Sequence, residues 1–303
     1  MNRKYDKIKK RNYTIAVIVL VLAAAITAVA VIVRGGYGVP VSGGSSGTSA
    51  PYYGVYELST LECISAANTT ERIAPASLTK IVTACTALKY ASADTVFEVG
   101  TELELVHDGS SLCYISQGQR LTLRDLIAGM MLASGNDAAY TVAVNTARLV
   151  CSEPLSDTEA VRYFADLMNS FAADVDAADS HFTDPDGWDD EQHYTTVADI
   201  ARFSACAMKH PEIRDCVALT DTYRVFETGE NVTWVNTNKL LQKESPYYCP
   251  SALGLKTGTT PRAGNCLSAV FERDGKEYIV IAAGCCTDEE RYKAVLDLYD
   301  KIK

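Results

Sequence analysis

Hydrophobic residues are unevenly distributed along the 303-residue chain, and the longest apolar run lies near its N-terminus. Residues 14–33 carry no charge, and a helix of 20 residues rises about 30 Å, the hydrocarbon thickness of a bilayer. Seven basic residues and one acidic residue lie within positions 1–34, so the positive-inside rule predicts a cytoplasmic segment at 1–13. We therefore predict a transmembrane anchor at 14–33 in the cell membrane, with everything after it extracytoplasmic. The small residues of Ala28-Val29-Ala30 leave a cleaved signal peptide and a secreted protein as the alternative.

Glycine, serine and proline dominate residues 34–52, a composition typical of a flexible linker. The remaining residues, 53–303, show the mixed apolar and polar pattern of one folded domain, with no internal repeat and no second linker. Two short strands are predicted within 53–66, on either side of a break near Ser59. Apolar residues at helical spacing predict helices at 76–90, 123–132, 137–150, 158–174, 196–208 and 288–303.

The strongest hairpin signal is Asp274-Gly275, which joins strands predicted at 266–273 and 276–283. Strands therefore lie at both ends of the domain, with helices between them. This order predicts an α/β (α+β) domain. Its antiparallel sheet takes strands from both ends of the domain and is covered by helices.

The net charge of −10 hides an asymmetry, because positions 35–303 carry 21 basic and 37 acidic residues. Binding to nucleic acid needs lysine and arginine clustered against the phosphates. We therefore exclude nucleic acid as a partner and interpret the acidity as that of a solvated surface.

One candidate for chemistry is Ser77-Leu78-Thr79-Lys80, at the start of a predicted helix. Positions three residues apart share a helix face, so Lys80 could be the base that a serine nucleophile needs. The amine must be neutral for this role, which requires burial or a nearby positive charge. Taken alone, the pattern is more often a helix N-cap followed by a surface lysine.

Two further patterns are Ser134-Gly135-Asn136, between two predicted helices, and Lys256-Thr257-Gly258, ahead of Thr259. A serine could relay a proton, an asparagine could hold a substrate amide, and a lysine could anchor a carboxylate. Glycine allows a backbone to approach a substrate closely. A helix cap is the ordinary interpretation of Ser134-Gly135-Asn136 alone. Each pattern nevertheless occurs once, in the order Ser-x-x-Lys, Ser-x-Asn, Lys-Thr-Gly.

That ordered set resembles the signature of serine penicillin-recognising enzymes. Over about residues 53–303 the chain resembles the low-molecular-mass D-alanyl-D-alanine carboxypeptidase family, in the segments 75–80, 132–138, 236–241 and 254–267. The resemblance implies a serine β-lactamase/D,D-peptidase-like fold with a helical subdomain beside the sheet. Many members of the family carry a second β-rich domain and a C-terminal amphipathic helix, whereas here we expect the anchor at the N-terminus.

The resemblance also implies roles for individual residues. Ser77 would attack the penultimate D-Ala carbonyl of a peptidoglycan stem peptide, and Lys80 would take its proton. Ser134 and Lys256 would return a proton to the leaving D-Ala. The backbone N–H groups of Ser77 and Thr259 would stabilise the oxyanion. Substrate binding would fall to Asn136, Lys256, Thr257, Gly258, Thr259 and Arg291.

β-Lactam antibiotics, which mimic the D-Ala-D-Ala end, would be trapped on Ser77. Arg291 has a second interpretation, as a surface arginine paired with Glu289 or Glu290. Three other functions stay open, namely a D,D-endopeptidase, a β-lactamase and a non-catalytic penicillin-binding sensor. A class A β-lactamase uses an added glutamate, and no matching Glu-x-x-Leu-Asn segment is present. The intact motif set argues against the sensor.

The ten cysteines include no C-x-x-C pair, and the four histidines include no H-E-x-x-H, so we expect no metal site and no cofactor. A two-residue turn would place Cys266 opposite Ala283 and diagonal to Cys285, which makes a disulfide possible there. Buried free thiols are the stronger expectation. The histidines are predicted to lie on the surface or in loops; they are His107, His181, His193 and His210.

Overall fold

The computed structural model describes residues 49–302. The predicted anchor at 14–33 lies outside the described residues, as does nearly all of the predicted linker. Within the described part, no helix is both long enough and apolar enough to cross a bilayer. Ordered structure begins slightly earlier than predicted, because Ala50 is already buried and the first strand starts at Tyr52.

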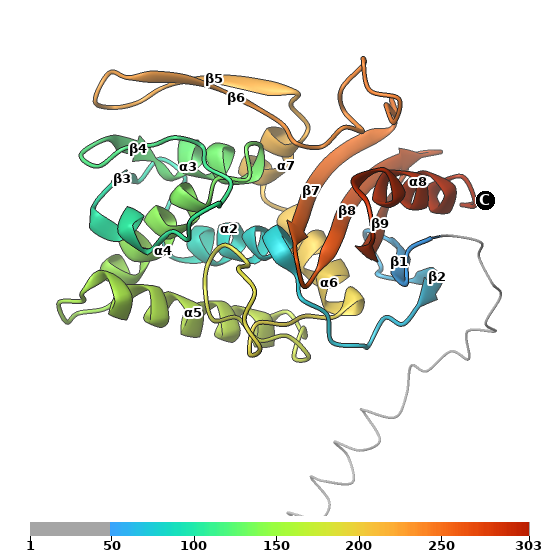
Figure 1. The fold of residues 1–303 in the computed structure, drawn as a ribbon, viewed down its shortest axis with the longest axis horizontal. Helices are drawn as coiled ribbons and strands as arrows, with labels where there is room; N and C mark the ends of the chain where they lie inside the picture. Colours follow the sequence, from blue (N-terminus) through green and yellow to red (C-terminus); the bar gives the residue numbers. More distant parts are fainter. Residues whose placement is uncertain (1–48, 303) are drawn as a thin grey trace, which may run out of the picture. The chain divides into compact units, whose positions relative to one another are not determined.

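A five-stranded antiparallel sheet forms the centre of the domain, with the strand order β2-β1-β9-β8-β7 (Figure 1). Two of its strands come from the start of the domain and three from its end, which confirms the prediction. Their bounds are β1 Tyr52–Glu57, β2 Cys63–Ala67, β7 Ala252–Thr260, β8 Gly264–Arg273 and β9 Lys276–Cys285. Strand β7 lies at an edge, so one side of its backbone is free to pair with another extended chain.

The β8–β9 hairpin turns at Asp274-Gly275, where both residues have positive φ, 55° and 77°. This is the backbone that a two-residue type I′ turn requires, so the hairpin prediction is confirmed. The register shifts between Asn265 and Leu267, however, and Asn265 pairs with Cys285. The predicted register holds as far as Leu267, which pairs with Ala282, and Cys266 lies at the irregularity that follows. All ten cysteines lie among the described residues, and all are free thiols.

Each face of the sheet is covered by helices because side chains alternate along the strands. Val280 and Ala282 of β9 pack in a core with α8 (Asp288–Tyr299), while Ile279 and Ile281 face the larger core beside α6 (Val197–Ala207). Helix α8 begins where the Thr287 hydroxyl accepts the Glu290 N–H at 3.2 Å, and it ends at Tyr299, before the predicted Lys303.

A second, mostly helical region lies beside the sheet (Figure 1). It is built from α2 Thr79–Tyr90, α3 Leu123–Met131, α4 Asn136–Val150 and α5 Asp157–Asp174. All four match predicted helices, and capping boxes at Thr122 and Ser156 fix the starts of α3 and α5. Several short elements escaped prediction: β3 Val96–Glu98, η2 Thr101–Leu105, β4 Arg120–Thr122, α7 Pro211–Val217, β5 Asp221–Val225 and β6 Asn231–Val235.

Candidate active site

Ser77 lies in a single 3-10 turn, η1 (Ala76–Leu78), that leads directly into α2. Lys80, one turn later and fully buried, donates from Nζ to Ser77 Oγ at 2.8 Å. Ala76, just before Ser77, has a positive φ of 49°. Such a conformation costs a non-glycine residue of the order of 1–3 kcal/mol. Backbone strain of this kind is common at active sites, and here it lies next to the candidate nucleophile.

Three acceptors hold the Lys80 amine: Ser77 Oγ, Asn136 Oδ1 at 2.7 Å and the Asp186 carbonyl at 3.0 Å. Burial lowers the pKa of Lys80 to about 8, against the opposing attraction of Asp186, Asp184 and Asp137. An appreciable fraction of the amine is therefore neutral near physiological pH. The serine and its base are thus in contact, with the base partly in its working form.

A second serine–lysine pair lies close to the first. Lys256 Nζ donates to Ser134 Oγ at 2.9 Å and to the Thr257 carbonyl at 2.9 Å, and both side chains are buried. Burial and the positive charges of Lys80 and Arg291 lower the pKa of Lys256 well below its usual range. Ser134 itself has a positive φ of 60°. The pair can pass a proton between amine and hydroxyl.

Asn136 begins α4 and is nearly buried. Its Oδ1 accepts from Lys80, and its Nδ2 donates to the Asp186 carboxylate. Both ends of the amide therefore have protein partners here, and they fix the position of the base. Binding of a substrate amide by Asn136 stays a prediction.

The loop 184–187 supplies side chains that sequence reasoning missed. It was predicted only as a turn, yet its Asp186 contacts both Lys80 and Asn136. Burial and the neighbouring Asp184 raise the pKa of Asp186 to about 7. Although burial alone would raise it, His193 holds the pKa of Asp184 well below its usual range. The sequence of this loop indicated only a turn, and a turn motif does not predict which residues the loop will contact.

His193 anchors this loop to the helix that carries the nucleophile. Its Nε2 lies 2.9 Å from Thr79 Oγ1, and its Nδ1 lies 3.0 Å from Asp184 Oδ2. The side chain is buried, so of the two predicted settings, surface or loop, the surface does not apply to His193. The residue lies in a loop, as predicted, but that loop packs against α2.

Gly187 is expected to tolerate no side chain. Its φ is +88°, and an added Cβ would lie 1.8 Å from the Ala76 carbonyl oxygen, next to the nucleophile. We expect Gly187→Ala to lower the free energy of unfolding by about 2–5 kcal/mol, through left-handed strain and overpacking, and to impair acylation of Ser77. Denaturant midpoints and labelling by fluorescent penicillin measure the two effects.

Gly118 provides the matched control for Gly187. Its φ of +87° is nearly identical, but an added Cβ would meet nothing within 4 Å. Gly118→Ala should therefore show only the backbone strain, of the order of 1–2 kcal/mol, with normal labelling. Equal losses of stability in the two variants would show that the contact with Ala76 is unimportant.

Strand β7 brings Lys256-Thr257-Gly258 against the nucleophile through its free edge. A Cβ on Gly258 would lie 3.0 Å from the Ser77 nitrogen, so glycine permits this close approach. Thr257 Oγ1 lies 2.8 Å from Thr237 Oγ1, in the segment 236–241 that carried part of the resemblance. The three predicted motifs therefore meet around Ser77, from α2, the α3–α4 connection and β7.

Arg291 extends from α8 to the same strand. Its guanidinium donates to the Gly258 carbonyl and to Thr259 Oγ1, both at 3.0 Å, and also pairs with Asp288. The side chain is buried. The alternative, a surface arginine paired with Glu289 or Glu290, is therefore wrong. Its positive charge therefore lies beside Thr259, one of the residues predicted to bind the substrate.

A serine held by a buried lysine, with a second lysine on an adjoining edge strand, is the arrangement typical of penicillin-recognising serine acyl-transfer enzymes. Comparison with known sequences makes the assignment specific. The profile of the D-alanyl-D-alanine carboxypeptidase family matches residues 47–286, and the chain belongs to that family.

Individual relatives agree. D-alanyl-D-alanine carboxypeptidase DacF of Bacillus subtilis is 29% identical over 236 residues, which cover 77% of this chain and 57% of the relative. D-alanyl-D-alanine carboxypeptidase of Streptomyces strain K15 is 32% identical over 216 residues, covering 67% and 69% respectively. The chain thus spans little more than half the length of the first of these relatives.

Solved structures show the same fold. The crystal structure of the Streptomyces K15 DD-transpeptidase superimposes with a TM-score of 0.75 at 26% identity, covering 84% of this chain and 96% of that one. The predicted D,D-peptidase-like domain, an antiparallel sheet with a helical subdomain, is confirmed.

Proposed function

We propose that this chain is a serine D-alanyl-D-alanine carboxypeptidase, a hydrolase that removes the terminal D-Ala from peptidoglycan stem peptides and is inhibited by penicillin. The observation that carries the proposal is the 2.8 Å contact between Ser77 Oγ and the buried Lys80 amine. The similarity to D-alanyl-D-alanine carboxypeptidases supports the choice of substrate.

Acylation begins with the neutral Lys80 amine. It takes the Ser77 proton as Oγ bonds to the carbonyl carbon of the penultimate D-Ala. The negative charge on the carbonyl oxygen is stabilised by the backbone N–H groups of Ser77 and Thr259. The peptide C–N bond then breaks, and the Ser134–Lys256 pair delivers a proton to the departing amine. Hydrolysis of the ester releases the shortened peptide and restores Ser77.

Substrate binding uses the free edge of β7. An extended peptide can pair with that edge, which sets the scissile carbonyl beside Ser77. The terminal carboxylate meets the hydroxyl groups of Thr257 and Thr259, with the charges of Lys256 and Arg291 behind them. Penicillin carries a carboxylate in the corresponding place and acylates the same serine.

The acylation rate should depend on pH through Lys80. Only the neutral amine accepts a proton, and the pKa of Lys80 is about 8. We therefore expect kcat/KM to rise about tenfold per pH unit below that value and to level off above it. Above about pH 7, where Asp186 is ionised, its charge raises the pKa of Lys80, so Asp186→Asn should move the upper part of this rise to lower pH. A rate that falls as pH increases toward 8 would contradict Lys80 as the base.

Arg291 should act on binding more than on chemistry. A charge-assisted interaction with the substrate carboxylate is worth about 1.5–3 kcal/mol of binding free energy. We therefore expect Arg291→Leu to raise KM roughly 10- to 150-fold with little change in kcat. Asp288→Asn is the matched control, because it removes the ion pair of Arg291 and leaves the cation. Steady-state kinetics of both variants decide the matter, and an unchanged KM in Arg291→Leu would count against the role.

The reaction itself is tested by D-alanine release from diacetyl-Lys-D-Ala-D-Ala, using the full chain in mild detergent. Release into water supports the carboxypeptidase. Transfer to an added amine, without net release of the shortened acid, would favour the transpeptidase named for the K15 structure. Cleavage only of cross-linked peptides would indicate an endopeptidase, and rapid penicillin hydrolysis a β-lactamase. Covalent labelling without any turnover would indicate a sensor.

We also propose that the domain is held outside the cytoplasm by the apolar segment 14–33. A peptidoglycan substrate outside the membrane is consistent with this placement. The test is fractionation of cells that express the full chain. The chain should remain in the membrane fraction after a high-salt wash, and an external protease should digest its domain. A released domain lacking residues 1–30 would indicate signal cleavage instead.

A further inference from the structure

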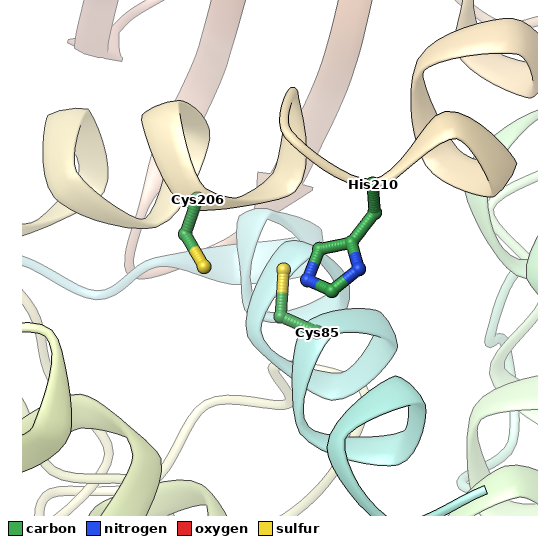
Figure 2. Close-up of side chains that lie close together, drawn as sticks. All are labelled: Cys85, Cys206 and His210. Carbon is green, nitrogen blue, oxygen red and sulfur yellow. The ribbon is translucent and has the colours of Figure 1, made fainter. Parts of the chain in front are cut away.

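Three potential metal ligands converge at a place that the proposed reaction does not use. Cys85 lies on α2, Cys206 on α6, and His210 at the start of α7. Their two sulfur atoms and one imidazole nitrogen all lie within 4.8 Å of one another. Figure 2 shows the three side chains turned toward a common point between α2 and the α6–α7 segment.

The cluster combines a buried end with a more accessible one. Cys85 is buried, whereas Cys206 and His210 are partly exposed, so an ion can reach the site from the α6–α7 side. The thiolate is the form of a cysteine that binds metals.

The donor set matches one class of ion. Two thiolates and an imidazole are ligands that zinc prefers, and a tetrahedral ion would keep its fourth position for water. A dication bound to two thiolates is neutral overall. The complex is therefore compatible with the buried position of Cys85, where an unpaired thiolate is costly.

We propose that Cys85, Cys206 and His210 bind one thiophilic divalent cation with the coordination preferences of zinc. Binding displaces the protons still held by the thiols and the imidazole. The ion then joins α2 to the α6–α7 segment. Because Cys85 lies on the same helix as Lys80, this link would steady the helix that holds the catalytic base without touching the substrate.

Cobalt is the probe for the site. The full chain in detergent is reduced, freed of reductant without oxygen, and titrated with Co²⁺. We expect thiolate-to-cobalt charge-transfer absorption that saturates at one ion per chain and disappears when Zn²⁺ is added. Cys85→Ser, Cys206→Ser and His210→Ala should each weaken binding by at least about 10-fold. Zn²⁺ should raise the Tm of the parent chain but not that of these variants.

Matched variants separate this site from other thiols. Cys216→Ser removes a buried thiol elsewhere, and His181→Ala removes a loop histidine, so both should retain full cobalt binding. Penicillin labelling of Ser77 verifies that each variant is folded. The proposal is wrong if no saturable band appears, or if the band survives in both Cys85→Ser and Cys206→Ser. A Cys85–Cys206 disulfide, with no ion bound after reduction, would also overturn it and indicate a redox pair.

Discussion

Replacing Ser77 with alanine is expected to lower kcat/KM for D-alanine release by about 10,000-fold or more and to abolish covalent labelling by penicillin. The reason is that the proposed mechanism acylates the Ser77 hydroxyl, which accepts a hydrogen bond from the buried Lys80 amine. Losses of this size follow removal of the nucleophile in other serine acyl-transfer enzymes. The measurements are release kinetics and the mass of the intact chain after exposure to penicillin.

The fold should survive this change, because Lys80 keeps Asn136 Oδ1 and the Asp186 carbonyl as acceptors. Ser170→Ala is the control. That serine is exposed on α5, and its hydroxyl donates only to the Asp166 carbonyl of its own helix. It should leave release and labelling unchanged. Persistent labelling of Ser77→Ala would assign the nucleophile to another residue.

Replacing Lys80 with methionine is expected to lower kcat/KM by about 1,000-fold or more. Methionine fills a similar volume and keeps an apolar stem in this fully buried position, but it cannot accept the Ser77 proton. Acylation by penicillin should slow along with peptide cleavage, because both begin with the same proton transfer. Stopped-flow labelling and D-alanine release measure the two rates.

Lys89→Met is the matched control, since Lys89 is on the same helix but is largely exposed and pairs with Asp174. It should change neither rate. If Lys80→Met instead acylated normally and accumulated the adduct, Lys80 would act in hydrolysis of the ester and another group would activate Ser77.

Elements dictated by nearby residues could be predicted from the sequence. The β8–β9 hairpin follows from Asp274-Gly275, and α3 to α5 follow from apolar spacing, with capping boxes at the starts of α3 and α5. Strand β7 was not predicted, because it lacks a clear alternation of apolar and polar residues. It contains Gly254, Gly258 and four threonine or lysine residues. Its place in the sheet depends on pairing with β8, which no local pattern reveals.

The residues of the candidate site likewise include some that short motifs predict and some that only contacts between distant segments reveal. The three motifs led to Ser77, Lys80, Ser134, Asn136 and Lys256 because each carries its chemistry in a short segment. Asp186 and His193 were missed because their contacts with Lys80 and Thr79 span more than a hundred residues. The same limit applies to Cys85 and Cys206, whose separation in sequence concealed a cluster that the absence of C-x-x-C seemed to exclude.

The central claim is that Ser77 carries out peptide cleavage and is the residue that penicillin blocks. The most direct test is to titrate the full chain with penicillin while measuring intact mass and D-alanine release on the same samples. We predict one adduct per chain, located on the peptide containing Ser77, with release falling in proportion to the acylated fraction. Release that continues in fully acylated protein, or an adduct located on any other residue, would contradict the account.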